Sequence, residues 1–371
     1  MKKRILFVVG TRPEIIKTAS VVQELKKDKS FRVGVCLSGQ HISMVTQMLE
    51  DFNIKPDHDL KIMKDAQSLI TIKKNLIPVL DEVYDNFKPD LVFVQGDTTT
   101  ALIAALVAFY KKIKVAHIEA GLRTFDRNFP FPEEMNRILI TRLTDLHFAP
   151  TRAARSNLVR EGVSRRSIFV TGNTGIDSLK YIIDKEYDFI DKHLQKMQWD
   201  RKIILLTAHR RENFGKGLAD VFKAAKKIAS KYEDILVIYP VHPNPNVQKP
   251  ANRLLSGAKN VLLLNNLHYR DLVKLMKVSH VILTDSGGIQ EEAPSLGKPV
   301  LILRDKTERP EVVRAGCAKI VGTDGDVIID NLEKLLFDEN LYKKMSVPRD
   351  IFGKGIASKI IAKKVKAFLK G

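Results

Sequence analysis

Short apolar runs alternate with helix-like patterns along the whole chain, and this alternation constrains its fold more than any other feature. Each run is rich in Val, Ile and Leu, and most are followed by a stretch with helical spacing. Strands that are buried on both faces read as continuous apolar runs, so this order favours an α/β fold with parallel sheets. The expected strands are Ile5–Val9, Val33–Leu37, Leu91–Gln95, Val115–Ile118, Leu146–Ala149, Ile168–Thr171, Ile203–Thr207, Ile235–Tyr239, Val261–Leu264, Val281–Leu283 and Val300–Leu303.

One local pattern occurs twice, which indicates two doubly wound domains of the same type. Residues 4–14 read RILFVVGTRPE and residues 202–212 read KIILLTAHRRE, so each copy has a strand and then a loop with Arg and Glu. At about 100–200 residues per domain, a chain of 371 residues also has room for two. We place the connection near residues 172–200. Residues 355–371 form an amphipathic pattern, and we expect this helix to pack on the other domain rather than on a membrane.

The composition limits which binding partners and which cellular compartment are expected. The 62 Lys and Arg against 43 Asp and Glu give a formal charge of +19, which suits an anionic partner such as a phosphorylated small molecule. The cations are spread out and are not interleaved with stacking aromatics, so we expect a solvated basic surface and no nucleic-acid partner. Cys36 and Cys317 are the only cysteines, so a disulfide-rich scaffold is not expected. No apolar run is long enough to serve as a secretory signal peptide or to span a membrane. A cytoplasmic protein without a membrane partner is expected.

Polar residues follow several strands of the first half, where ligands of open α/β sheets bind. Arg12 and Lys17 flank a helix start that also favours anions, so they fit a phosphate, although two ordinary surface cations would look the same. Three carboxylates follow strands or begin a helix: Asp97, Glu119 and Glu133. Structural roles compete for each, as a helix cap, as a salt bridge to Arg123 and as a favourable helix-dipole charge. A threonine of residues 98–100 is expected to cap a helix that starts at Ala101.

The second half has two such loops. His209 ends a strand beside two arginines, which disfavour its protonated form. Ser286, Gly287 and Gly288 lead from a strand directly into a helix, and backbone N–H groups in such a place suit a diphosphate. Glycines that serve only a tight turn are the alternative. Arg309 follows the next strand and is expected to face the same ligand.

Several signatures are absent from the sequence. There is no Walker P-loop, no G-x-G-x-x-G, no H-E-x-x-H and no C-x-x-C. We therefore expect no cofactor and no metal site.

Taken in order, these motifs identify a family. The chain resembles the non-hydrolysing UDP-N-acetylglucosamine 2-epimerases, and the resemblance covers nearly its whole length. The motifs that carry it are GTRPE (10–14) with Lys17, Gln40-His41, GDTTT (96–100), HIEAGLRT (117–124), PFPEE (130–134) with NR (136–137), TGNT (171–174), HRREN (209–213), YPVHPNPNV (239–247), TDSGGIQEEAPSLGKPVLILRD (284–305) and TERPE (307–311).

This resemblance implies a glycosyltransferase-B-like fold, with two Rossmann-like domains that face each other across a cleft. The first domain would comprise residues 1–172 with the C-terminal helix at 353–371, and the second, which binds UDP, residues 173–352. The family also implies a homodimer and a UDP-sugar substrate.

The resemblance further implies roles for individual residues. Asp97, Glu119 and Glu133 match the catalytic carboxylates, and His209 is placed with them near the diphosphate. The other residues expected to bind substrate are Arg12, Lys17, Gln40, His41, Arg137, Arg210, His242, Ser286, Gly287, Gly288, Glu292 and Arg309.

The chain departs from the family at two places. Leu267 and Leu272 stand where the family often has a glutamine and a phenylalanine near the uracil. Ser43 and Ala66 stand where some bacterial members use a glutamine and an arginine to bind an activating second substrate, whereas Gln40, Arg210 and His242 match. Weak or absent activation by substrate is expected.

The reaction implied is reversible epimerisation at C2 of UDP-N-acetylglucosamine, by anti elimination of UDP to 2-acetamidoglucal and its re-addition. A base at C2 and an acid on the opposite face are then required. A hydrolysing epimerase, an epimerase of a modified UDP-sugar, a glycosyltransferase and a nucleic-acid-binding protein are the alternatives considered.

Overall fold

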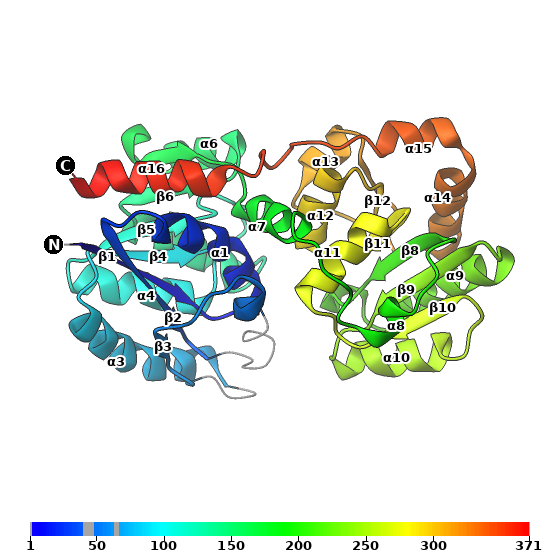
Figure 1. The fold of residues 1–371 in the computed structure, drawn as a ribbon, viewed down its shortest axis with the longest axis horizontal. Helices are drawn as coiled ribbons and strands as arrows, with labels where there is room; N and C mark the ends of the chain where they lie inside the picture. Colours follow the sequence, from blue (N-terminus) through cyan, green and yellow to red (C-terminus); the bar gives the residue numbers. More distant parts are fainter. Residues whose placement is uncertain (1, 40–47, 63–66, 371) are drawn as a thin grey trace. The chain divides into compact units, whose positions relative to one another are not determined.

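The computed structural model describes residues 2–39, 48–62 and 67–370. The chain divides into two compact units, unit 1 with Met1–Tyr181 and Phe352–Gly371, and unit 2 with Ile182–Ile351 (Figure 1). The boundary expected from the sequence lies before helix α7 (Thr174–Ile183), and most of that helix belongs to unit 1.

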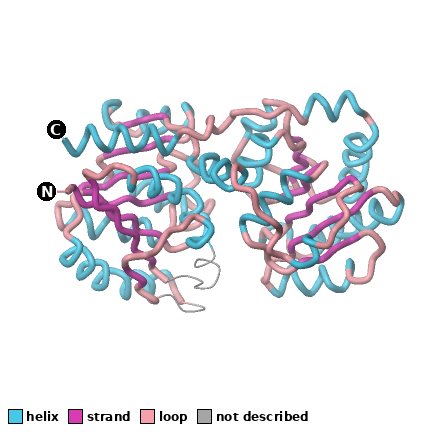
Figure 2. The backbone as a smooth tube through the Cα atoms, viewed as in Figure 1, coloured by secondary structure: helices cyan, strands magenta, loops and turns pink. Residues whose placement is uncertain are grey.

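Unit 1 is built on one parallel sheet with the order β3-β2-β1-β4-β5-β6-β7. Figure 2 shows its strands in magenta and the surrounding helices in cyan. Its strands are β1 (Lys3–Val9), β2 (Phe31–Leu37), β3 (His58–Asp59), β4 (Leu91–Gln95), β5 (Lys114–Ile118), β6 (Leu146–Ala149) and β7 (Ile168–Val170). Its helices are α1 (Arg12–Lys26), α3 (Leu69–Phe87), α4 (Thr99–Tyr110), α5 (Glu133–Leu143), α6 (Arg152–Arg160), the short η1 (Arg165–Ser167), α7 and α16 (Ala357–Lys370).

The core of unit 1 explains why its strands read as continuous apolar runs. Side chains of β1 and β4 are buried on both faces, and the rings of Phe7 and Phe93 stack with centroids 4.4 Å apart. One face of the sheet is covered by α3 and α4, whose buried residues include Tyr84 and Leu102. Burial of such side chains is the main favourable term in folding.

The C-terminal helix α16 packs on α1 and buries Ile361 and Val365. Asp177 of α7 caps its first turn, because its carboxylate accepts the backbone N–H of Ala357 at 3.1 Å and of Ser358 at 2.8 Å. Burial raises the pKa of Asp177, and the hydrogen bonds from Ser358 and Ala357 oppose that shift. The amphipathic tail is therefore a packed helix of unit 1.

Unit 2 has a second parallel sheet with the order β10-β9-β8-β11-β12-β13. Its strands are β8 (Lys202–Thr207), β9 (Ile235–Pro240), β10 (Val261–Leu264), β11 (Val281–Thr284), β12 (Val300–Ile302) and β13 (Ala318–Ile320). Its helices are α8 (Lys192–Gln195), η2 (Arg211–Asn213), α9 (Lys216–Lys231), α10 (Pro245–Leu255), α11 (Tyr269–Val278), α12 (Gly287–Glu292), η3 (Ala293–Leu296), α13 (Pro310–Arg314), α14 (Gly325–Phe337) and α15 (Glu339–Met345).

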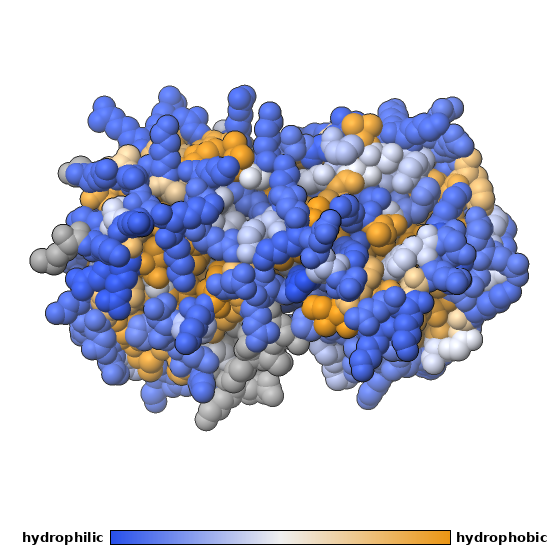
Figure 3. Space-filling model, viewed as in Figure 1, coloured by the Kyte–Doolittle hydropathy of each residue, from blue (hydrophilic) through white to orange (hydrophobic). Residues whose placement is uncertain are grey.

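The expected α/β class with two doubly wound parallel sheets is confirmed, and every expected strand is present within a residue or two. Two strands were missed, because β3 has only two residues and β13 is a three-residue edge strand. Hydrophilic side chains cover most of the visible face of each unit (Figure 3), as expected when helices cover the apolar strands. Among the described residues, none of the helices has the length and apolar character needed to cross a membrane.

Candidate active site

The loop after β1 is fixed by Glu14 in the first turn of α1. This buried carboxylate accepts the N–H groups of Gly10 at 3.0 Å and Thr11 at 2.7 Å, and the hydroxyl of Thr98 at 2.8 Å. Burial raises the pKa of Glu14, and these hydrogen bonds oppose the shift. A Cβ atom on Gly10 would lie 2.5 Å from Ser38 Oγ and 2.8 Å from Thr100 Oγ1, so close approach rather than a turn requires this glycine.

Lys17 and Glu119 form a largely buried ion pair between α1 and the end of β5. Gln95 donates to the same oxygen, Glu119 Oε2, at 3.1 Å. The expected alternative, a salt bridge from Glu119 to Arg123, is wrong. Arg123 instead binds both carboxylate oxygens of Glu161, at 2.6 and 2.9 Å, because its side chain lies on the α5–α6 side of the sheet. This costly buried carboxylate thus has two polar partners, a lysine in α1 and a glutamine at the carboxyl end of β4.

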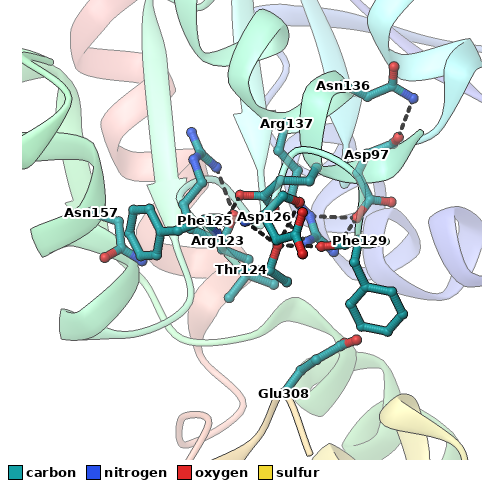
Figure 4. Close-up of polar contacts among 12 residues, drawn as sticks. Asp97, Arg123, Thr124, Phe125, Asp126, Phe129, Asn136, Arg137, Asn157 and Glu308 are labelled. Atoms are coloured by element: carbon teal, nitrogen blue, oxygen red, sulfur yellow. Dashed lines mark hydrogen bonds and ion pairs between the residues drawn. The ribbon is translucent and has the colours of Figure 1, made fainter. Parts of the chain in front are cut away.

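Asp97 follows β4 and is held by two residues of α5 (Figure 4). Arg137 places Nε 2.7 Å and Nη2 2.6 Å from the same oxygen, Oδ2, while Asn136 donates to the backbone carbonyl at 2.8 Å. Oδ1 accepts no hydrogen bond from any residue that the structure describes. Asp97 does not cap α4: that helix begins at Thr99, two residues earlier than expected, and Thr98 caps it through the N–H of Ala101.

The adjacent residues Glu133 and Glu134 begin α5 but have different surroundings. Glu133 is half-buried, and within the described part of the chain its carboxylate has no hydrogen bond or ion pair. Glu134 is fully buried, accepts the N–H of Phe125 at 3.1 Å and pairs with Arg137 at 3.2 Å. Of the two, Glu133 is the one whose carboxylate is open to a ligand.

A buried histidine supports the loop that carries Asp97. The Nε2 atom of His117 lies 2.7 Å from the carbonyl oxygen of Gly96. Burial lowers the pKa of His117 to about 3, so the ring is neutral near pH 7 and donates this hydrogen bond.

In unit 2, the fully buried Asp285 after β11 organises the loop after β8. Its Oδ2 atom accepts the N–H groups of His209 and Arg210, each at 2.8 Å, and the side-chain amide of Asn213 at 3.1 Å. Oδ1 lies 3.6 Å from His209 Nδ1. Burial lowers the pKa of His209; Asp285 opposes that shift and Arg210 adds to it, so the direction predicted from the two arginines is right but burial is the larger cause.

The glycines after Ser286 lie in the first turn of α12, and neither has the positive φ that a tight turn would require. A Cβ atom on Gly288 would meet nothing closer than Ser286 Oγ at 4.0 Å, and one on Gly287 would lie 3.4 Å from the guanidinium carbon of Arg309. These positions leave the backbone open to a ligand beside a cation. Arg309 is itself held by Glu291 at 2.8 Å and Glu308 at 2.7 Å.

Of the remaining expected residues of unit 2, His242 lies beside His209 and Glu292 is the last residue of α12. The ring of His242 stacks on that of His209, with centroids 4.9 Å apart. Glu292 is buried and accepts the hydroxyl of Tyr269 at 3.0 Å. Leu267, one of the two departures, is buried.

Of the other residues expected to bind substrate or an activator, the structure describes Arg12. Arg12 is half-buried at the first position of α1. Gln40, His41, Ser43 and Ala66 lie outside the described residues. No group of three His, Cys, Asp or Glu that could hold a metal ion occurs in residues 2–39, 48–62 or 67–370.

Comparisons with known proteins decide the family. The family model described as UDP-N-acetylglucosamine 2-epimerase matches residues 23–366. The chain belongs to the UDP-N-acetylglucosamine 2-epimerase family. The Escherichia coli K12 protein named UDP-N-acetylglucosamine 2-epimerase is 47% identical over 376 aligned positions, which cover 98% of each chain.

Solved structures of this 2-epimerase family share the fold. The Neisseria meningitidis UDP-GlcNAc 2-epimerase bound to UDP-GlcNAc is 47% identical, with a TM-score of 0.92, and the match covers 99% of this chain and 100% of that one. A glycotransferase of kitacinnamycin, 12% identical with a TM-score of 0.67, shows the likeness to glycosyltransferases at the level of fold alone.

Three residues of this 2-epimerase were missed in the sequence: Glu14, Glu134 and Asp285. Each is buried and holds the backbone or a side chain of a loop or helix that carries site residues, rather than facing the open side of a loop. The signal available was a carboxylate one to three residues from a predicted site residue within an otherwise apolar or helical stretch.

Proposed function

We propose that this chain interconverts UDP-N-acetylglucosamine and UDP-N-acetylmannosamine by inverting C2, without releasing free sugar. One observation carries this proposal: the chain matches a structure bound to UDP-GlcNAc over the full length of both chains, at 47% identity.

The chemistry accounts for the residue types at the ends of the unit 1 strands. The C2–H bond of a sugar is not acidic, so the proton leaves as the C1–O bond breaks and UDP departs with that electron pair. The product, 2-acetamidoglucal, has a C1=C2 double bond. UDP then adds back to C1 while a proton is delivered to C2 from the other face. No oxidation state changes overall, so no redox cofactor is needed.

The proposed proton-transfer groups are Asp97, Glu119 and Glu133. Asp97 is anchored through Oδ2 and keeps Oδ1 open, which suits an oxygen that exchanges a proton with substrate. Glu133 has no partner among the described residues, and Glu119 lies beside Lys17. We propose that Arg12, Lys17 and Arg137 bind the anionic or polar parts of the substrate, together with Gln40 and His41.

The proposed nucleotide groups belong to unit 2. The backbone at Ser286, Gly287 and Gly288 would bind the diphosphate. The guanidinium groups of Arg309 and Arg210 lie beside Gly287 and would add positive charge. His209 would reach the departing diphosphate beside His242, and Glu292 would accept hydrogen bonds from the ribose hydroxyls. The proposed roles are thus divided between unit 1, which supplies the proton-transfer groups, and unit 2, which supplies the nucleotide groups.

The non-hydrolysing outcome distinguishes this proposal from a hydrolysing epimerase. Incubation with UDP-N-acetylglucosamine, followed by separation of the nucleotide sugars, is expected to give UDP-N-acetylmannosamine at a stable equilibrium. Accumulation of UDP and free N-acetylmannosamine would select the hydrolysing reaction instead. No change in the substrate would redirect the proposal to a modified UDP-sugar.

We further propose that the chain forms a homodimer. Large apolar side chains are exposed on neighbouring helices of unit 1, with Ile70 77% and Ile77 41% exposed on α3, and Phe109 55% and Tyr110 71% exposed at the end of α4. Such patches typically mark protein–protein contacts. Sedimentation equilibrium of the wild type and of an Ile70→Lys, Tyr110→Lys variant tests this, with a monomeric variant expected and an unchanged mass contradicting it.

A further inference from the structure

We propose that Glu134 is a positioning residue for the epimerase reaction: through Arg137 it sets the orientation of Asp97. This inference rests on the function proposed above. It concerns the second glutamate of the pair at the start of α5, not Glu133, which is proposed to act on substrate.

The first observation is the complete enclosure of Glu134. It has no exposed surface, and each carboxylate oxygen has one partner: Oε1 accepts the N–H of Phe125 at 3.1 Å and Oε2 lies 3.2 Å from Arg137 Nη1. Burying a carboxylate costs free energy unless it is paired, so the presence of Glu134 at this buried position calls for a structural or functional reason.

The second observation is how Arg137 divides its donors. Nη1 serves Glu134, whereas Nε and Nη2 both serve Oδ2 of Asp97. A guanidinium group is planar and its donors point in fixed directions. Contact with Glu134 on one edge therefore fixes the plane in which the other edge holds Asp97, and this in turn fixes the direction of the open oxygen, Oδ1.

The third observation concerns the loop of residues 124–132. Phe125 has a φ of +61°, in the left-handed region that is unfavourable for a bulky residue, and the residue is 60% exposed. Such a conformation persists only where neighbouring groups hold it. The carboxylate of Glu134 accepts the N–H of this same residue. Thr124 donates to the carbonyl of Phe129 and closes the loop (Figure 4). Glu134 therefore ties the loop, Arg137 and Asp97 into one unit.

Among the residues that the structure describes, no other charged group gives Arg137 an equivalent second anchor. Glu119, which pairs with Lys17, makes no hydrogen bond or ion pair with Arg137 within the described part of the chain and acts on it only through its charge. Arg123 is occupied by Glu161. His117 is neutral near pH 7, since burial lowers its pKa to about 3.

Glu134→Gln tests this inference, because the amide keeps an acceptor for Phe125 but removes the charge that holds Arg137. We expect kcat to fall about 10- to 100-fold, as small misplacements of a catalytic group do, while the Kd for UDP stays within about twofold. If Glu134 acts through Arg137, its effect disappears once Arg137 is altered. Glu134→Gln in an Arg137→Lys background is therefore expected to lower kcat by less than about twofold further.

Glu161→Gln is the matched control, because it breaks a comparable buried arginine–glutamate pair of unit 1 that does not contact Asp97. It is expected to lower Tm but to leave kcat of the folded enzyme unchanged. The inference is overturned if Glu134→Gln lowers only Tm, or if its loss of kcat multiplies fully with that of Arg137→Lys. A wild-type enzyme that forms no UDP-N-acetylmannosamine would refute the proposed function itself, independently of these variants.

Discussion

Arg137 holds Asp97 by one carboxylate oxygen, with Nε at 2.7 Å and Nη2 at 2.6 Å from Oδ2. The other oxygen accepts no hydrogen bond within the part of the chain that the structure describes. A carboxylate held in this way has a fixed orientation and an oxygen that remains open to substrate. Glu119 is fixed comparably, by Lys17 and by Gln95 at 3.1 Å. Two of the three proposed proton-transfer groups, Asp97 and Glu119, are therefore preorganised by neighbouring polar side chains.

Replacing Glu119 by Gln is expected to remove proton transfer while leaving nucleotide binding intact. The amide cannot accept a proton from C2, so kcat should fall by about 10²- to 10⁴-fold, the usual contribution of a general acid or base. UDP binding belongs to unit 2 in this account, so the Kd for UDP measured by calorimetry should not change. Glu24→Gln, which alters an exposed ion pair on α1, is the control and should leave both values unchanged. Near-normal turnover of the Glu119 variant would contradict the assigned role.

A methyl group at Gly288 is expected to weaken UDP binding without harming the fold. Its Cβ would meet no protein atom closer than 4.0 Å, and alanine is about 1 kcal/mol better than glycine inside a helix, so Tm should not fall. The same methyl group would occupy the space in which the diphosphate approaches the backbone, and we expect the Kd for UDP to rise by about tenfold or more. Gly325→Ala, whose Cβ makes an ordinary 3.6 Å contact in α14, is the control. Unchanged UDP affinity in the Gly288 variant would place the diphosphate elsewhere.

Unit 1 is expected to lose stability as the pH falls below about 6.5, in part because of His117. Its pKa is lowered to about 3 by burial, whereas the unfolded chain takes up the proton near pH 6.5. The stabilising contribution is thus fully present above pH 6.5 and is lost as the pH falls towards 3, at about 1.4 kcal/mol per pH unit.

Hydrogen exchange of the β4 and β5 amides between pH 4.5 and 7.5 measures this contribution within unit 1. His117→Asn removes the titrating group, so the free energy of opening should depend less on pH in the variant than in the wild type. The variant should also be less stable at pH 7.5, because the bond to the Gly96 carbonyl is lost. Equal slopes in the two proteins would show that His117 does not carry the effect.

The sheets could be predicted from the sequence because their strands are apolar on both faces. Ile5–Val9 and Ile203–Thr207 are buried along nearly their whole length, and their shortness distinguishes them from the longer apolar run of the buried helix α4. The edge strand β13 could not be found in this way, since Lys319 and Ile320 are not fully buried and the strand has three residues. The segment is recognised as a strand by its parallel pairing with β12, which local sequence does not reveal.

The partners within the site were harder to predict than its members. Lys17 reaches Glu119 because β1 and β5 lie two positions apart in the sheet, with β4 between them, and strand order is not written in local patterns. Arg123, only four residues from Glu119, was the nearer cation along the chain but binds Glu161. Glu133 and Glu134 could not be distinguished either, because which of two adjacent residues faces inward depends on where α5 begins.

The central claim is that C2 of the sugar loses and regains a proton while UDP is recaptured. Incubation with UDP-N-acetylglucosamine in heavy water, followed by NMR of the purified nucleotide sugars, tests it most directly. Deuterium is expected at C2 of UDP-N-acetylmannosamine and, at equilibrium, at C2 of UDP-N-acetylglucosamine as well, with no free sugar. Epimerised product that retains its C2 proton, or substrate that neither epimerises nor exchanges, would contradict the account.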